Sequence, residues 1–143
     1  MITIDHYKSD DEIRLLVAEF ESCSFHPSEF RHHQHLAVVL WYVASLPYTD
    51  ASERMKRGIQ RLAASYGKTG YHETITEFWL RVVRAFLPDG ERPESIAVVA
   101  NQLIEKFADK NLILNYFSAE LLASPEARSN WVEPDVKRLP FPD

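Results

Sequence analysis

The placement of the prolines constrains the fold of this chain more than any other feature of its sequence. Proline lacks a backbone N–H and breaks a helix interior, so prolines in helical proteins mark helix ends. None of the six prolines before residue 140 interrupts a run with helical periodicity; they are Pro27, Pro47, Pro88, Pro93, Pro125 and Pro134. The chain also has only four glycines, few for a fold built on hairpin turns. These two observations predict an all-α protein.

Apolar residues recur at helical spacing in the segments that the prolines separate. In the first segment, Ser9 and Glu12 form a capping-box pattern, and Ile13, Leu16 and Phe20 follow on one face. The same reasoning predicts helices over residues 10–23, 28–46, 50–65, 71–87, 93–107 and 109–123. The expected architecture is a single-domain bundle of five or six helices over residues 1–143.

The two ends of the chain lack helical periodicity. Residues 1–8 are expected to be extended, because no second strand-like run is present to pair with them. Residues 125–143 contain four prolines and are predicted to form an extended tail. We expect this tail to pack on the helices, because it carries large apolar side chains at Trp131, Val132, Leu139 and Phe141.

Composition and charge exclude several classes of partner. The net charge of −5 argues against nonspecific binding to nucleic acid or to anionic membranes. The longest charge-free apolar run, residues 36–47, is shorter than the roughly 20 residues that cross a bilayer. A lone cysteine and the lack of a signal-peptide pattern favour a cytoplasmic protein. A symmetric homodimer is the default expectation for its oligomeric state.

Four of the six histidines fall within ten residues, and their spacing selects two of them. In a helix that begins at Ser28, His32 and His35 lie about 60° apart on the apolar face that continues through Leu36. Glu29 lies one turn earlier on the same edge, whereas His33 points about 100° aside. Glu29, His32 and His35 are therefore predicted to face the interior together.

A third inward histidine is expected at the start of the helix over 71–87. His72 shares an apolar stripe with Ile75, Thr76 and Trp79, with Glu73 pointing aside. If the apolar faces of the two helices meet, His32, His35 and His72 converge as possible ligands for zinc, iron or copper. Glu29 or Glu73 would then serve as a further ligand or as a general base.

The site also has candidate pocket residues. Tyr71, Thr76 and Trp79 are the predicted lining of a small-molecule pocket beside His72. A metal-free version uses His72 or His35 as general base, with Tyr71, Thr76 or Glu73 orienting the substrate. In a further alternative, the histidines only hydrogen-bond within the core.

Three segments resemble a family of small, uncharacterised all-α bacterial proteins. They are Phe30-x-His32-x-x-His35-Leu36, Tyr71-His72-Glu73-Thr74-Ile75-Thr76 and Trp131-Val132-Glu133-Pro134-Asp135. The resemblance covers nearly the whole chain and implies that His32 and His35, rather than His33, are the motif histidines. It implies no activity, substrate or cofactor.

Two hypotheses for the function follow from the sequence. The first is a small cytoplasmic metal-dependent enzyme, hydrolytic or oxidative, that acts on a small molecule through His32, His35 and His72. The second is a non-catalytic helical interaction module whose histidines are structural. The distance between the imidazoles separates the two hypotheses, because zinc–nitrogen bonds are only about 2.0 to 2.1 Å long.

Overall fold

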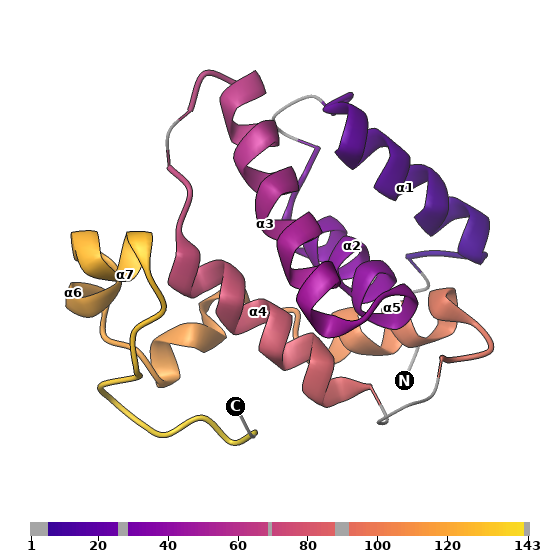
Figure 1. Ribbon diagram of the computed structural model, residues 1–143. Helices are drawn as coiled ribbons and strands as arrows, with labels where there is room; N and C mark the ends of the chain where they lie inside the picture. Colours follow the sequence, from indigo (N-terminus) through magenta and orange to yellow (C-terminus); the bar gives the residue numbers. More distant parts are fainter. Residues whose placement is uncertain (1–5, 26–28, 69, 88–91, 142–143) are drawn as a thin grey trace.

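The computed structural model describes residues 6–25, 29–68, 70–87 and 92–141, and the regular elements within these ranges are all helical (Figure 1). In chain order they are α1 (Asp10–Ser22), α2 (His32–Ser45), α3 (Tyr48–Ser65), α4 (Glu73–Phe86), α5 (Ile96–Lys106), the 3-10 helix η1 (Lys110–Asn115), α6 (Ala119–Leu122) and α7 (Pro125–Ser129). The all-α prediction is confirmed. None of these described helices has the length and apolarity needed to span a bilayer.

The first helix forms as its sequence predicts. The Ser9 hydroxyl accepts a hydrogen bond from the Glu12 N–H at 3.4 Å, and this cap begins α1. The apolar face is buried, with Ile13 and Phe20 fully inaccessible. The helix ends at Cys23, whose left-handed backbone has a φ of 56°. Capping and periodicity are local signals, and both were therefore readable from the sequence.

The second helix, α2, is the centre of the protein. It packs against α1, α3, α4 and α5, and the five consecutive residues from Leu36 to Leu40 are all fully buried. A helix that is apolar on every side is typical of a core position with neighbours all round. The first turn of α2 differs from its middle, because it begins with His32 and His33 and emerges from the core.

The last third of the chain departs from the prediction. The helix expected over 109–123 is instead η1 followed by the short α6, and residues 125–129, expected to be extended, form α7. Each short helix has a serine N-cap: Ser118 Oγ accepts from Leu121 N–H at 3.1 Å, and Ser124 Oγ accepts from Ala127 N–H at 3.2 Å. The extended-tail prediction is wrong for Pro125–Ser129, because a serine cap and a proline at the first helical position favour a helical turn.

Several contacts join the segment after α7 to the helices. The Arg81 guanidinium lies 3.9 Å from the centre of the Trp131 ring. The Val136 N–H donates to the Tyr116 carbonyl at 2.9 Å. The Phe141 ring lies 6.4 Å from that of Phe78. These contacts involve residues spread over the segment.

The first described residues, His6 and Tyr7, are bound to α5 by hydrogen bonds. The backbone N–H groups of His6 and Tyr7 both donate to the Asn101 Oδ1 at 3.0 Å, and Asn101 Nδ2 donates to the Tyr7 carbonyl at 2.8 Å. Asn101 thereby fixes His6 and Tyr7 against α5. Residues 1–5 of the expected extended segment and the expected N-cap Ser28 lie outside the described residues.

Candidate functional site

His72 is a helix cap rather than a residue inside α4. Its Nδ1 accepts a hydrogen bond from the Ile75 N–H at 3.1 Å. Its Nε2 lies 2.7 Å from the Leu122 carbonyl oxygen, and it must donate because a carbonyl can only accept. Both ring nitrogens are thus engaged, so His72 presents no lone pair to a metal in this arrangement.

Glu73, a predicted base, belongs to an ionic network between α3 and α4. The Lys56 ammonium lies 2.7 Å from a carboxylate oxygen of both Glu73 and Glu77. Burial lowers the pKa of Lys56, but its hydrogen bonds to Glu73 and Glu77 outweigh this and raise the pKa. On the other side of Glu77, Arg81 Nε lies 3.1 Å from the carboxylate, and the Tyr48 hydroxyl donates to it at 2.8 Å.

Two of the three predicted pocket residues also have internal partners. The Tyr71 hydroxyl donates to Glu73 at 2.7 Å, and burial followed by this hydrogen bond raises the pKa of Tyr71. The buried Thr76 hydroxyl donates to the His72 carbonyl at 2.8 Å. Neither residue lines the cavity that contains His32 and His35.

Glu29 does not join His32 and His35. It precedes α2, which begins at His32 with Arg31 as its N-cap, so the helical spacing assumed for Glu29 does not apply. Glu29 lines a different cavity, beside Tyr7 and Glu19. Among the described residues, no group of three or more His, Cys, Asp or Glu side chains is placed to hold a metal ion. The predicted metal centre therefore has no support in the geometry.

The structure brings together His32, His35 and Trp79. The His32 Nε2 donates to the Phe107 carbonyl at 2.7 Å, which fixes the ring at the start of α2. The rings of His32 and Trp79 meet edge to face with their centres 4.7 Å apart. All three side chains line one open pocket of about 450 Å³.

His35 differs from His32 and His72 in its hydrogen bonding. Its ring nitrogens make no hydrogen bond with the part of the chain that the structure describes. Burial, followed by the charge of His32, lowers the pKa of His35 to about 4. At neutral pH, His35 is therefore an uncharged imidazole with one donor and one acceptor, and neither is used by a described residue.

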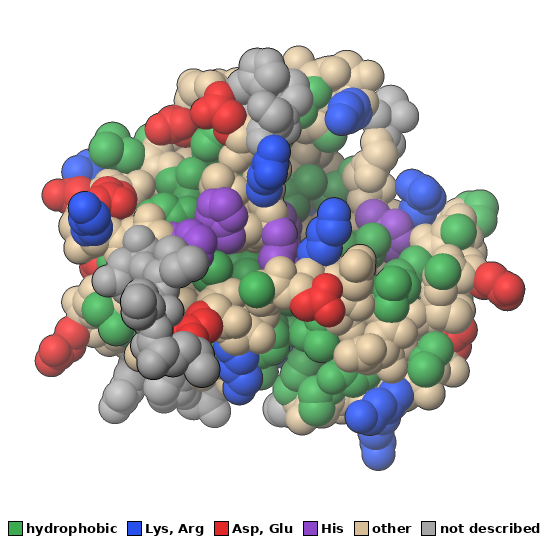
Figure 2. All heavy atoms as spheres, turned by 180° about the vertical axis from the view of Figure 1, so that it is seen from behind, with side chains coloured by type: hydrophobic (Ala, Val, Ile, Leu, Met, Phe, Trp, Pro, Cys, Tyr) green, Lys and Arg blue, Asp and Glu red, His purple; other side chains and the backbone are tan. Residues whose placement is uncertain are grey.

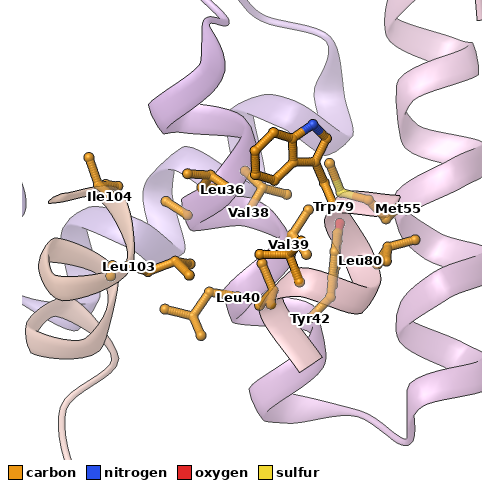
Figure 3. Close-up of a cluster of buried hydrophobic side chains, with 14 of the residues drawn as sticks. Leu36, Val38, Val39, Leu40, Tyr42, Met55, Trp79, Leu80, Leu103 and Ile104 are labelled. Atoms are coloured by element: carbon orange, nitrogen blue, oxygen red, sulfur yellow. The ribbon is translucent and has the colours of Figure 1, made fainter. Parts of the chain in front are cut away.

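Trp79 shares this property. It is only 3% exposed, and it lies at the margin of the buried cluster near Leu36 and Met55 (Figure 3). Its indole N–H makes no hydrogen bond to any described residue, although a buried indole N–H usually has a partner. No described polar side-chain atom that is fully sealed from solvent lacks a partner. The ring nitrogens of His35 and Trp79 are therefore reached from the pocket.

The rest of the pocket is apolar and basic. Its wall is completed by residues from the start of α2, from α4 and from the η1–α6 region: Phe30, Arg31, Ile75, Lys110, Asn111, Ile113, Leu114 and Leu122. No acidic side chain is among these lining residues. Figure 2 shows histidines across the middle of one face with Lys and Arg side chains beside them. The pocket therefore combines an apolar body with donors and positive charge.

A larger cavity lies elsewhere, between the end of α4, Phe107, η1 and Phe141, and has a volume of about 770 Å³. Its two cations are engaged with aromatic rings. The Arg84 guanidinium lies 4.0 Å from the centre of the Tyr48 ring, and the Lys106 ammonium lies 5.5 Å from that of Phe107. The smaller pocket is the better candidate, because the ring nitrogens of His35 and Trp79 make no hydrogen bond to the described residues.

Sequence reasoning identified His32, His35 and Trp79 but missed the wall of the pocket formed by η1. Lys110, Asn111 and Ile113 lie in a stretch that reads as one regular helix, and no signal marks it as a 3-10 turn that faces α2. No protein-family profile matches this chain, and no curated protein or solved structure matches it.

Proposed function

We propose that this protein binds a small organic anion in the pocket of His32, His35 and Trp79. One observation carries the proposal: the imidazole of His35 and the indole N–H of Trp79 line the same pocket, and neither has a hydrogen-bond partner among the described residues. Both groups are reached from the pocket, where water would otherwise hydrogen-bond to them. A ligand group that accepts both hydrogen bonds would replace this water.

The lining of the pocket indicates the chemistry of the ligand. Ile75, Ile113 and the Trp79 ring offer apolar contact for a small hydrophobic body. A carboxylate accepts hydrogen bonds from an indole N–H and an imidazole N–H without itself needing a donor. Lys110 and Arg31 add positive charge at the rim, and the lining contains no acid to oppose it. A small apolar or aromatic carboxylate fits this combination.

Binding accounts for the site better than catalysis by His35. A general base acts best when its pKa lies near the working pH, whereas burial lowers the pKa of His35 to about 4. The other predicted catalytic groups, Glu73 and His72, are held by Lys56 and by backbone partners. As a single cysteine favours a reducing compartment, we propose that the ligand is a cytoplasmic metabolite.

The second candidate function is a helical interaction module with structural histidines. The hydrogen bonds of His72 to Ile75 and Leu122 favour this interpretation for that residue. They do not account for His35 and Trp79, which hold no comparable contacts. The two candidates are therefore separated by testing His35.

The test uses three probes of nearly equal shape: phenylacetate, 2-phenylethanol and 2-phenylethylamine. NMR titration should show saturable shifts of the His35 ring and Trp79 indole N–H signals with phenylacetate, and at least tenfold weaker binding of the amine. His35→Leu preserves the volume but removes the hydrogen bond, and should weaken phenylacetate about tenfold, the equivalent of about 1.4 kcal/mol. His35→Asn, which keeps a donor, should recover part of this loss.

Two results would contradict the proposal. In the first, the three probes bind equally well or not at all. In the second, phenylacetate binds His35→Leu as tightly as it binds the natural chain, while circular dichroism shows that both are folded. Lys137→Ala is the matched control, since Lys137 is an exposed lysine outside the pocket.

A further inference from the structure

A second cavity adjoins the proposed ligand pocket. It has a volume of about 560 Å³ and is lined by His6, Arg31, His32, His33, Ile104, Ala108 and Lys110. Three of these residues, Arg31, His32 and Lys110, also line the first pocket. His32 thus lines both cavities, which lie next to each other.

The side chains around the second cavity form an unusual group for an acidic protein. The chain carries a net charge of −5, yet every ionisable side chain that lines this cavity is a lysine, an arginine or a histidine. Lys110 makes no ion pair with the described residues. Lys110, His6 and His33 therefore offer charged and neutral N–H donors to this cavity.

The start of α2 adds to this positive character. Six described helices, among them α1, α4 and α5, have an accepting side chain on the N-cap residue itself, whereas at α2 the Gln34 Oε1 accepts from the Arg31 N–H at 3.0 Å. The first turn of α2 also contains no acidic residue, unlike that of α1 or α4. The helix dipole at such a terminus favours an anion. Both His32 and His33 lie in this turn and line the cavity.

The outer wall is held in place by a buried residue. Asn101 binds the backbone of His6 and Tyr7 through three hydrogen bonds, and it is only 7% exposed. This contact fixes His6 so that its ring lies 5.0 Å from that of His33. Burial, followed by the charges of His6, His32 and Arg31, lowers the pKa of His33. The lowered pKa is consistent with the positive surroundings.

We propose that this second cavity binds the phosphate group of a phosphate monoester, whose apolar part occupies the pocket of His35 and Trp79. A phosphate has three oxygens that accept hydrogen bonds from several donors at once, which suits the imidazoles of His6 and His33 and the Lys110 ammonium, with Arg31 adding positive charge. A divalent cation is disfavoured by the two permanent positive charges. This proposal rests on the proposed function, because the apolar part of the ligand lies in that pocket.

Two variants separate the cavities. His33 lines the second cavity and not the first, whereas His35 lines the first and not the second. Inorganic phosphate should shift the NMR signals of the His6 and His33 rings and leave those of His35 unchanged. Phenyl phosphate should shift both groups of signals and bind at least tenfold more tightly than inorganic phosphate, because its ring adds apolar contact.

The expected losses follow from the same assignment. Lys110→Ala should weaken inorganic phosphate about tenfold, the loss of one charge-assisted contact, and Lys137→Ala should leave it within twofold. His33→Leu should weaken both phosphate compounds, and His35→Leu should weaken phenyl phosphate alone. Added chloride should weaken each of these interactions.

The failures of the two proposals can be told apart. Phosphate binding that does not saturate, or that Lys110→Ala leaves unchanged, overturns the phosphate site even if phenylacetate binds as expected. Phenyl phosphate that binds no more tightly than inorganic phosphate and leaves the His35 signals unmoved overturns the shared ligand. Saturable phosphate binding without phenylacetate binding overturns the proposed function and leaves the phosphate-binding cavity supported.

Discussion

The starts of α2 and α4 carry similar residues but differ in where their polar groups are directed. At the start of α4, both nitrogens of His72 and the carboxylate of Glu73 have partners within the molecule. At the start of α2, the His35 ring nitrogens have no hydrogen-bond partner among the described residues. A histidine near a helix start can thus hold the fold together or remain available to a ligand. Its hydrogen bonds distinguish the two cases.

The largest loss of stability is expected from replacing Lys56, which pairs with Glu73 and Glu77. Lys56→Met leaves Glu73 and Glu77 close together with no ammonium between them, and both are largely buried. Removing one partner of a buried ion pair costs about 3 kcal/mol or more. Urea unfolding should show a loss of about 3 kcal/mol, against less than about 0.5 kcal/mol for the exposed Lys110→Ala. If Lys56→Met and Lys110→Ala lost equal stability, the start of α4 would not be held by its ion pairs in the way proposed here.

The cap at α4 should give the next largest effect. His72→Ala removes the acceptor for the Ile75 N–H and the donor to Leu122. An N-cap contributes about 1 kcal/mol and a hydrogen bond about as much, so a loss of about 2 kcal/mol is expected. His72→Asn, a good N-cap residue, should restore about half of it. If thermal unfolding of His72→Ala matched that of the natural chain, His72 would not be a structural cap.

The smallest of the three effects concerns the dependence of stability on pH. The pKa of His35 is about 4 in the folded chain and 6.5 as its ordinary value. Between these values, the unfolded chain binds a proton that the folded chain does not, so stability falls as the pH falls. From pH 6.5 to pH 5, this group should cost about 1.5 kcal/mol.

The measurement is urea unfolding of the natural chain and of His35→Leu at both pH values. The difference between the two proteins isolates His35 from the other histidines. A natural chain that loses no more stability than His35→Leu at pH 5 would show that His35 is not desolvated in the folded state.

The sequence was informative wherever the structure depends on local contacts. The cap at Ser9 and the apolar face through Phe20 are set by residues a few positions apart, and both were predicted. His32, His35 and Trp79 were predicted as site residues, and all three line the pocket. Periodicity places such residues because α2 and α4 are regular over their interiors.

The remaining errors have two physical causes. Helical spacing cannot show whether a residue is the cap or the first turn, and so His72 was placed on a face of α4 and Glu29 on a face of α2. The second cause is distance along the chain. Lys110 lines the second cavity because η1 places it there, and His6 lines it because Asn101 binds the His6 backbone. Neither arrangement can be read from the residues that neighbour Lys110 or His6 in the sequence.

The position of α2 has a practical consequence. Its first turn borders both cavities, while its middle forms the centre of the core (Figure 3). Unfolding of that turn would therefore disturb the helix against which α1, α3, α4 and α5 pack. A compound that binds only the folded chain stabilises it by mass action, by about 2.7 kcal/mol at a concentration one hundred times its dissociation constant, and thereby raises the melting temperature. Thermal-shift screening of a metabolite collection can thus find the natural ligand without any assay of activity.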